Sequence, residues 1–142
     1  PLLRHENKKL RSEALRSIYK TGGKLRGAIL LEALPDADDQ LKMEIVEALG
    51  NARCVEAVPE LIRMLEERKS VSSDVRDDFE EKLCIALGAI GAPEALPVLK
   101  KISGSFISRY AKKVKIAAGI AAVSIDKKQE GNRQRMKGEK PA

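Results

Sequence analysis

The chain has 142 residues, a formal net charge of +6 at pH 7, 34% charged residues and only 3% aromatic residues. A chain of this length can bury a core as one domain without disulfides or a structural metal, and its two cysteines and single histidine lack zinc-ligand spacing. It has neither an apolar run of membrane-spanning length nor a signal-peptide core, so we expect a cytoplasmic protein without metal, cofactor or membrane contact. A core of Leu, Ile, Val and Ala with few aromatics favours an all-α fold.

Apolar residues recur along most of the chain with the 3.6-residue period of amphipathic helices. Clusters of Gly and Pro separate these segments, and Asp38 precedes one of them as an N-cap. The pattern predicts helices near residues 6–20, 24–34, 38–50, 55–68, 74–90, 93–102 and 107–125. Residues 126–142 form a basic tail with almost no apolar content, expected to be disordered or a fraying extension of the last helix.

The chain also contains an internal repeat. The segment LKMEIVEALG from Leu41 matches FEEKLCIALG from Phe79 at a shift of 38 residues, and VEAVPEL from Val55 matches PEALPVL from Pro93 at the same shift. A weaker copy of the apolar pattern lies 35 residues after Phe79, at Val114, and another lies 31 residues before Leu41. Because one helical pair cannot cover its own apolar face, successive pairs are expected to stack into an open solenoid.

The segments ALGNARCVEAVPELIRML and ALGAIGAPEALPVLKKI resemble HEAT repeats of the short bacterial class called PBS-lyase HEAT-like repeats. The resemblance covers roughly residues 2–125. It implies a right-handed α-α superhelix of three to four HEAT-like hairpins within residues 1–125, and a non-enzymatic scaffold for protein–protein interaction. A bilin-lyase-like activity is an alternative that the same resemblance implies. The opening PLLRHE looks like the end of a second helix without its partner, so we expect a piece of a longer array.

Few residues suggest catalysis or metal binding. His5 lies among charged residues without a partner base or nucleophile and is interpreted as a surface histidine. Cys84 falls in an apolar stripe and is expected to be buried, whereas Cys54, in a turn, is the more exposed thiol. The acids of LPDADDQ lack calcium-loop spacing and are interpreted as helix-capping charges. No catalytic, cofactor or metal residues are therefore predicted.

Charge alternates along the chain: residues 1–31 carry a net +6, residues 32–97 a net −9 and residues 98–142 a net +9. In a solenoid this order becomes bands on the surface. Mixed signs favour a protein partner, held on the concave row of second helices by residues predicted to point outward. These are Arg26, Glu60, Arg63, Met64, Glu67, Lys100 and Lys101.

The alternative partner is a nucleic acid. A basic patch that could neutralise phosphates is formed in the sequence by Arg109, Lys112, Lys113 and Lys115, followed by the basic tail. The acidic middle of the chain and the scarcity of aromatic residues for base stacking speak against it.

Overall fold

The structure, a computed structural model, describes residues 9–10, 13–14, 17, 23–104, 106 and 109–138. Within these residues it is an all-α solenoid without strands. The α-helices are α2 (Gly23–Ala33), α3 (Asp39–Asn51), α4 (Val58–Glu67), α5 (Arg76–Ile90), α6 (Leu96–Gly104) and α7 (Lys112–Gly138). Single 3-10 turns precede or follow them: η2 (Leu34–Asp36), η3 (Val55–Ala57), η4 (Ser73–Val75) and η5 (Pro93–Ala95). The expected helix over 6–20, His5 and PLLRHE lie wholly or largely outside the described residues.

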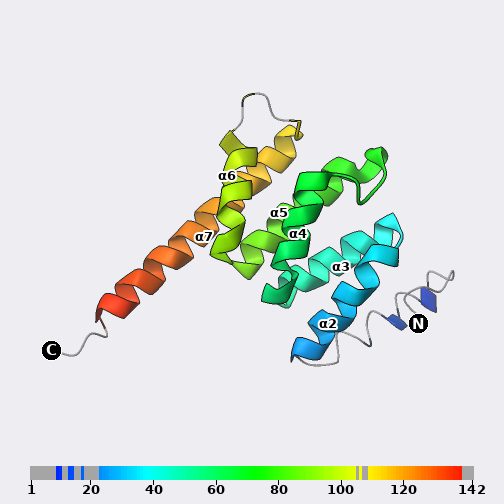
Figure 1. The fold of residues 1–142 in the computed structure, drawn as a ribbon, viewed down its shortest axis with the longest axis horizontal. Coiled ribbons are helices and arrows are strands. Elements are labelled where there is room, and N and C mark those ends of the chain that lie inside the picture. Colours follow the sequence, from blue (N-terminus) through cyan, green and yellow to red (C-terminus); the bar gives the residue numbers. More distant parts are fainter. Residues whose placement is uncertain are drawn as a thin grey trace.

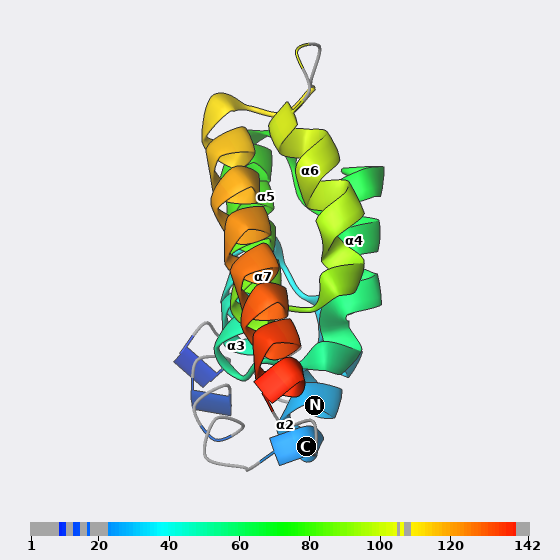
Figure 2. The ribbon, with the colours of Figure 1, turned by 90° about the vertical axis from the view of Figure 1, so that its left-hand side faces the viewer.

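The helices form two layers (Figures 1 and 2). The first helices of the repeats, α3, α5 and α7, stack side by side in one layer, and the second helices α4 and α6 run beside them in the other. Figure 2 looks along this stack from the end at which α6 and α7 lie nearest the viewer. The stacked pairs confirm the predicted solenoid.

The core between the layers is built from the apolar stripes of the repeats. The predicted first-helix stripes are buried in all three copies that the structure describes well: Leu41, Ile45 and Leu49; Phe79, Leu83 and Leu87; Val114, Ala118 and Ala122. The second helices add Leu61, Leu65, Leu99 and Ile102, each at most 1% exposed. Burying one such leucine contributes about 2 kcal/mol, so the stripes supply most of the stabilisation of the stack.

Two helical glycines allow the first helices to approach closely. A Cβ on Gly50 would lie 2.8 Å from the Cα of Ala86, and a Cβ on Gly88 would lie 2.9 Å from the Cβ of Ala121. Both glycines end the ALG motif that marks the repeat in the sequence. The motif therefore forms the contacts that join α3 to α5 and α5 to α7.

The helix ends follow local sequence signals. The Asp38 side chain accepts a hydrogen bond of 2.8 Å from the backbone N–H of Leu41, which confirms its predicted capping role and contributes about 1 kcal/mol. Pro59 and Pro97 are the second residues of α4 and α6, where no intrahelical donor is lost. Gly91 ends α5 with a φ of 76°, a left-handed conformation that suits glycine.

A buried ion pair ties the end of α4 to α5 and to the segment before α7. Arg68 donates to the two carboxylate oxygens of Glu80 at 2.8 and 3.1 Å, and Glu80 is only 1% exposed. The Arg68 guanidinium also lies 4.5 Å from the ring centre of Tyr110, whose hydroxyl donates to the Leu65 carbonyl at 2.7 Å. We name these three residues, Arg68, Glu80 and Tyr110, the joint.

The last helix differs from its predicted bounds of 107–125. It begins at Lys112, because the joint holds Tyr110 outside the helix, and it continues to Gly138 through most of the expected tail. A helix already nucleated by its buried part extends readily through Lys, Gln, Glu and Arg, and Arg135 and Lys137 in its last turn suit the helix dipole. Residues 126–138 project beyond the other helices as an arm (Figure 1).

Candidate protein-binding surfaces

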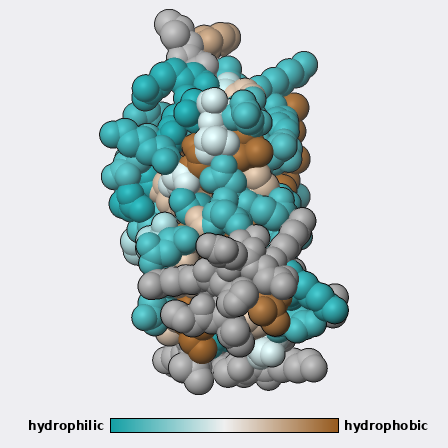
Figure 3. Space-filling view, turned by 90° about the vertical axis from the view of Figure 1, so that its right-hand side faces the viewer, coloured by the Kyte–Doolittle hydropathy of each residue, from teal (hydrophilic) through white to brown (hydrophobic). Residues whose placement is uncertain are grey.

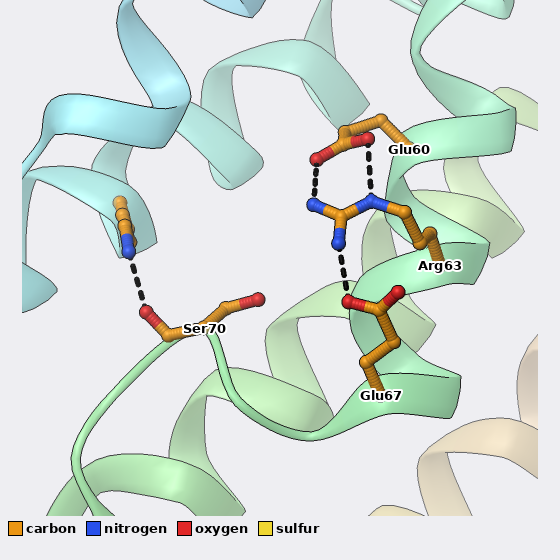
Figure 4. A network of polar contacts seen from close by, with 5 residues as sticks. Glu60, Arg63, Glu67 and Ser70 are labelled. Carbon is orange, nitrogen blue, oxygen red and sulfur yellow. Dashed lines mark hydrogen bonds and ion pairs between the residues drawn. The ribbon is translucent and has the colours of Figure 1, made fainter.

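The charged residues predicted on α4 are engaged with one another. Arg63 donates its Nε to Glu60 at 2.9 Å and its two terminal nitrogens to Glu60 and Glu67 (Figure 4). These hydrogen bonds raise the pKa of Arg63 and lower the pKa of Glu60. Arg63 and Glu67 remain about half exposed, so the cluster presents one net negative charge on the second-helix layer.

Two predicted outward positions differ from expectation. Met64 is 3% exposed and belongs to the core, because it lies three residues after Leu61 on the buried side of α4. Arg26 is half-buried in α2. Lys100 and Lys101 are exposed on α6, and Lys100 Nζ lies 3.4 Å from the carboxylate of Asp126. The second-helix layer therefore gathers charges of both signs without an apolar centre at these positions.

The predicted basic patch is only partly available. Arg109 and Lys112 are exposed and Lys115 is half-buried, whereas Lys113 forms an ion pair with Asp78 of α5. Hydrogen bonding to Asp78 raises the pKa of Lys113. Further basic residues lie exposed along the arm, where the sequence placed the tail: Lys127, Lys128, Arg133, Arg135 and Lys137.

An apolar groove runs between α5 and α7 on the outer side of the first-helix layer. It has a volume of about 540 Å³. Three isoleucines stand around it with large exposed fractions: Ile85 at 58%, Ile116 at 54% and Ile120 at 66%. Small residues form its floor and wall, among them Gly88, Ala89, Ala117 and Ala121. Glu81 and Lys113 line the same groove, so apolar contact is combined with one charge of each sign.

This groove was not predicted, because the charge pattern of the sequence favoured the second helices as the binding surface. A signal was nevertheless present: Ile85, Ile116 and Ile120 lie off the buried stripes of their helices, where a solvated face would carry polar residues. The surface at the end of the molecule opposite the arm differs from the groove in its hydropathy. There hydrophilic side chains separate small hydrophobic patches (Figure 3).

The two cysteines and the acids of LPDADDQ, considered above for chemical roles, have structural roles. Cys84 is fully buried as predicted, and burial raises the pKa of its thiol to about 12. Cys54, expected to be exposed, is only 8% exposed, because it packs against Gly27, where a Cβ would lie 2.6 Å from its sulfur. Burial raises the pKa of Cys54 too. Asp39 accepts the backbone N–H of Ser72 at 3.2 Å, so with Asp38 it acts in local structure.

The described residues lack two features, a metal-binding cluster and a membrane-spanning helix. No group of three or more His, Cys, Asp or Glu side chains there has an arrangement that could hold a metal ion. None of the described helices is long and apolar enough to cross a membrane.

Comparison with known proteins places the chain among helical-repeat proteins. The family model described as HEAT repeats matches residues 27–122. A human protein, deoxyhypusine hydroxylase, is 32% identical to this chain over 107 residues. The aligned region makes up 75% of this chain but only 34% of the human protein, so the chain spans about a third of that relative. No solved structure matches the chain significantly.

Proposed function

Because the chain belongs to the HEAT-repeat family, we propose that it is a non-enzymatic scaffold that binds a protein partner in the groove between α5 and α7. The observation that carries the proposal is the exposure of Ile85, Ile116 and Ile120 around one groove. Isolated exposed apolar residues are common on protein surfaces, but residues that converge on a concave apolar surface are typical of a binding site. The finer assignment to the PBS-lyase HEAT-like class, and a reducing cytoplasmic setting for the two unpaired thiols, belong to the same proposal.

The groove suits a partner that inserts an apolar side chain and places charged groups at the rim. Its floor at Gly88 and Ala121 is smooth, since neither residue has a long side chain, and beside it Glu81 provides a hydrogen-bond acceptor and Lys113 a donor. Apolar anchors supply most of the affinity in such interfaces, while rim charges set orientation and association rate.

The enzymatic alternative comes from the human relative, whose name describes a hydroxylase of deoxyhypusine. We propose that this chain does not share that activity by itself. It has a single histidine, His5, and no sequence cluster of acid, base and nucleophile. Assay of the purified chain for hydroxylation of a deoxyhypusine substrate tests this part, and turnover that follows the chain through purification would contradict it. Covalent attachment of a bilin by the chain would likewise contradict a non-enzymatic function.

A second candidate function is nucleic-acid binding, which is favoured by the exposed basic residues of the arm. Phosphate binding weakens steeply as salt rises, whereas an apolar groove keeps its affinity. Titration of labelled DNA and RNA at low and at physiological salt separates the two functions.

The scaffold proposal is tested with two matched substitutions. Ile85→Glu introduces a charge into the groove, whereas Val55→Glu places the same charge at a residue of equal exposure, 59%, in η3. Both variants should fold, because both side chains are solvent-exposed. Proteins captured by the unmodified chain should be retained by Val55→Glu and lost by Ile85→Glu, as measured by quantitative mass spectrometry. Equal capture by all three forms would reject the groove as the binding site.

A further inference from the structure

The repeat makes it possible to compare the stacking side of successive first helices. On α3, Gly50 contacts the next first helix, and Val46 and Met43 lie four and seven residues before it on the same side. On α5 the same positions, 38 residues later, are Gly88, Cys84 and Glu81. Val46 and Cys84 are fully buried there, because α5 covers the side of α3 and α7 covers the side of α5.

On α7 the counterparts of Gly88, Cys84 and Glu81, 35 residues later again, are Val123, Gly119 and Ile116 respectively. Ile116 and Val123 are each 54% exposed, and the nearest atom to a Cβ on Gly119 would be the Cβ of Ser103 at 3.6 Å. Ile116 and Val123 stay more than half exposed, Gly119 is half-buried beside Ser103 of α6, and α7 lies at the front of the stack (Figure 2). We call Ile116, Gly119 and Val123 the open face.

The charges that border the open face are inverted relative to α5. Asp77 and Glu80 flank the covered side of α5, and α5 receives a lysine of α7 through the ion pair between Asp78 and Lys113. The positions that correspond to Asp77 and Glu80 on α7 are Lys112 and Lys115.

Further along α7, Lys127 lies one turn after Val123, at the other end of the open face. The two nearby acids are engaged: Asp126 lies 3.4 Å from Lys100 and Glu130 lies 3.8 Å from Arg133. The rim of the open face is therefore basic.

We propose that the open face binds an acidic amphipathic helix of a partner protein, which stacks on α7 as α7 stacks on α5. This inference rests on the proposed scaffold function and adds the class of partner. The apolar centre, Ile116 and Val123, continues the stacking interface of the preceding repeats, with Val123 at the position that Gly50 and Gly88 occupy on α3 and α5. The three rim lysines select carboxylates on the flanks of the incoming helix.

The test uses two synthetic peptides that carry the apolar stripe by which α7 itself stacks. Both contain residues 112–126, held helical by a hydrocarbon staple on the side away from the stripe. The acidic peptide has glutamate in place of Lys112, Lys113 and Lys115, and the basic peptide keeps these lysines. Binding of each fluorescent peptide to the full chain is measured by anisotropy at low and at physiological salt.

The acidic peptide should bind at least tenfold more tightly than the basic one, and its advantage should shrink as salt rises. The double variant Val123→Glu with Lys127→Glu, whose residues lie outside the groove, should abolish binding, whereas Val55→Glu, in η3, should leave it unchanged. Circular dichroism checks that each variant folds, which is expected because Val123, Lys127 and Val55 are all exposed.

Three outcomes would overturn the proposal: equal binding of the two peptides, no binding of either, or binding that survives the double variant. Self-association of the chain that the double variant abolishes would identify a second copy as the occupant, and displacement of the acidic peptide by single-stranded DNA would identify a nucleic acid. Each of these would also reject it. If the acidic peptide does not bind but Ile85→Glu still loses the captured proteins, the groove remains supported as a binding site. Only the proposal for the open face is then rejected.

Discussion

The closed contact between α3 and α5 and the open face of α7 are built from equivalent positions of one repeat, yet they meet different surroundings. At the closed contact, Gly50 lies against Ala86 and Val46 is fully buried. At the open face, Val123, the counterpart of Gly50, is 54% exposed, and Gly119, the counterpart of Val46, has only Ser103 beside it. Position in the stack therefore decides whether the side chains at these positions stabilise the fold or are available to a partner.

The largest expected effect is at the joint, on the closed side. Arg68→Met leaves the buried carboxylate of Glu80 without its ion-pair partner and should lower the free energy of unfolding by about 3 kcal/mol. The double variant Arg68→Met with Glu80→Met removes both charges and should recover most of the loss. Urea denaturation of the three proteins checks this, and a double variant no more stable than the single one would contradict it.

A substitution at the closed contact should have the next largest effect. Gly50→Leu forces a side chain against the backbone of Ala86, so the free energy of unfolding should fall by about 2 kcal/mol. Thermal denaturation followed by circular dichroism measures it. Unchanged stability would mean that α3 and α5 do not approach as closely as described.

Alkaline pH should weaken the closed side through Cys84. The pKa of its thiol rises from an ordinary value of 9.0 to about 12 in the fold, so the folded chain keeps a proton that the unfolded chain releases. Stability is therefore complete below pH 9 and falls between pH 9 and 12, by up to about 1.4 kcal/mol per pH unit. Tyr110, whose pKa burial also raises, acts in the same direction. Urea denaturation at several pH values should give a shallower decline for Cys84→Ala, and an identical slope would exclude the thiol as the cause.

The smallest expected effect lies at the open face and has the opposite sign. Gly119→Ala meets only Ser103 at 3.6 Å and replaces a flexible helical residue, so it should stabilise the chain by about 1 kcal/mol or less. A rise in melting temperature supports the open geometry. A fall would show that another segment packs on Gly119.

Most of the fold could be predicted, because the stacked helical pairs require a repeating pattern of apolar residues in the sequence. The apolar period and the repeated ALG motif placed the boundaries of α2, α3 and α5 within two residues of those observed, and α4 and α6 begin three residues later than predicted, after η3 and η5. Two errors came from interactions that a period does not encode. Tyr110 reaches back to Leu65 and delays the start of α7, and Cys54 is buried against Gly27 although it follows a turn.

The candidate surfaces were harder to predict than the fold. Helical phase placed Arg63 and Glu67 at exposed positions correctly, but it misplaced Met64, because the buried sector of α4 is wider than one stripe. The groove was missed because it depends on how α5 and α7 sit side by side, and the isoleucines of each helix alone do not reveal it. The ion pair between Asp78 and Lys113 removes part of a basic patch for the same reason.

The joint also determines how the solenoid comes apart. Arrays of helical repeats usually lose their terminal units first, since each unit contacts only its neighbours. Here the Tyr110 hydroxyl and the Leu65 carbonyl are 45 residues apart in sequence, and the contact anchors the beginning of the last described helix to the end of α4. Together with the ion pair between Arg68 and Glu80, this contact links α4, α5 and the start of α7, so we expect α7 to detach together with the pair before it.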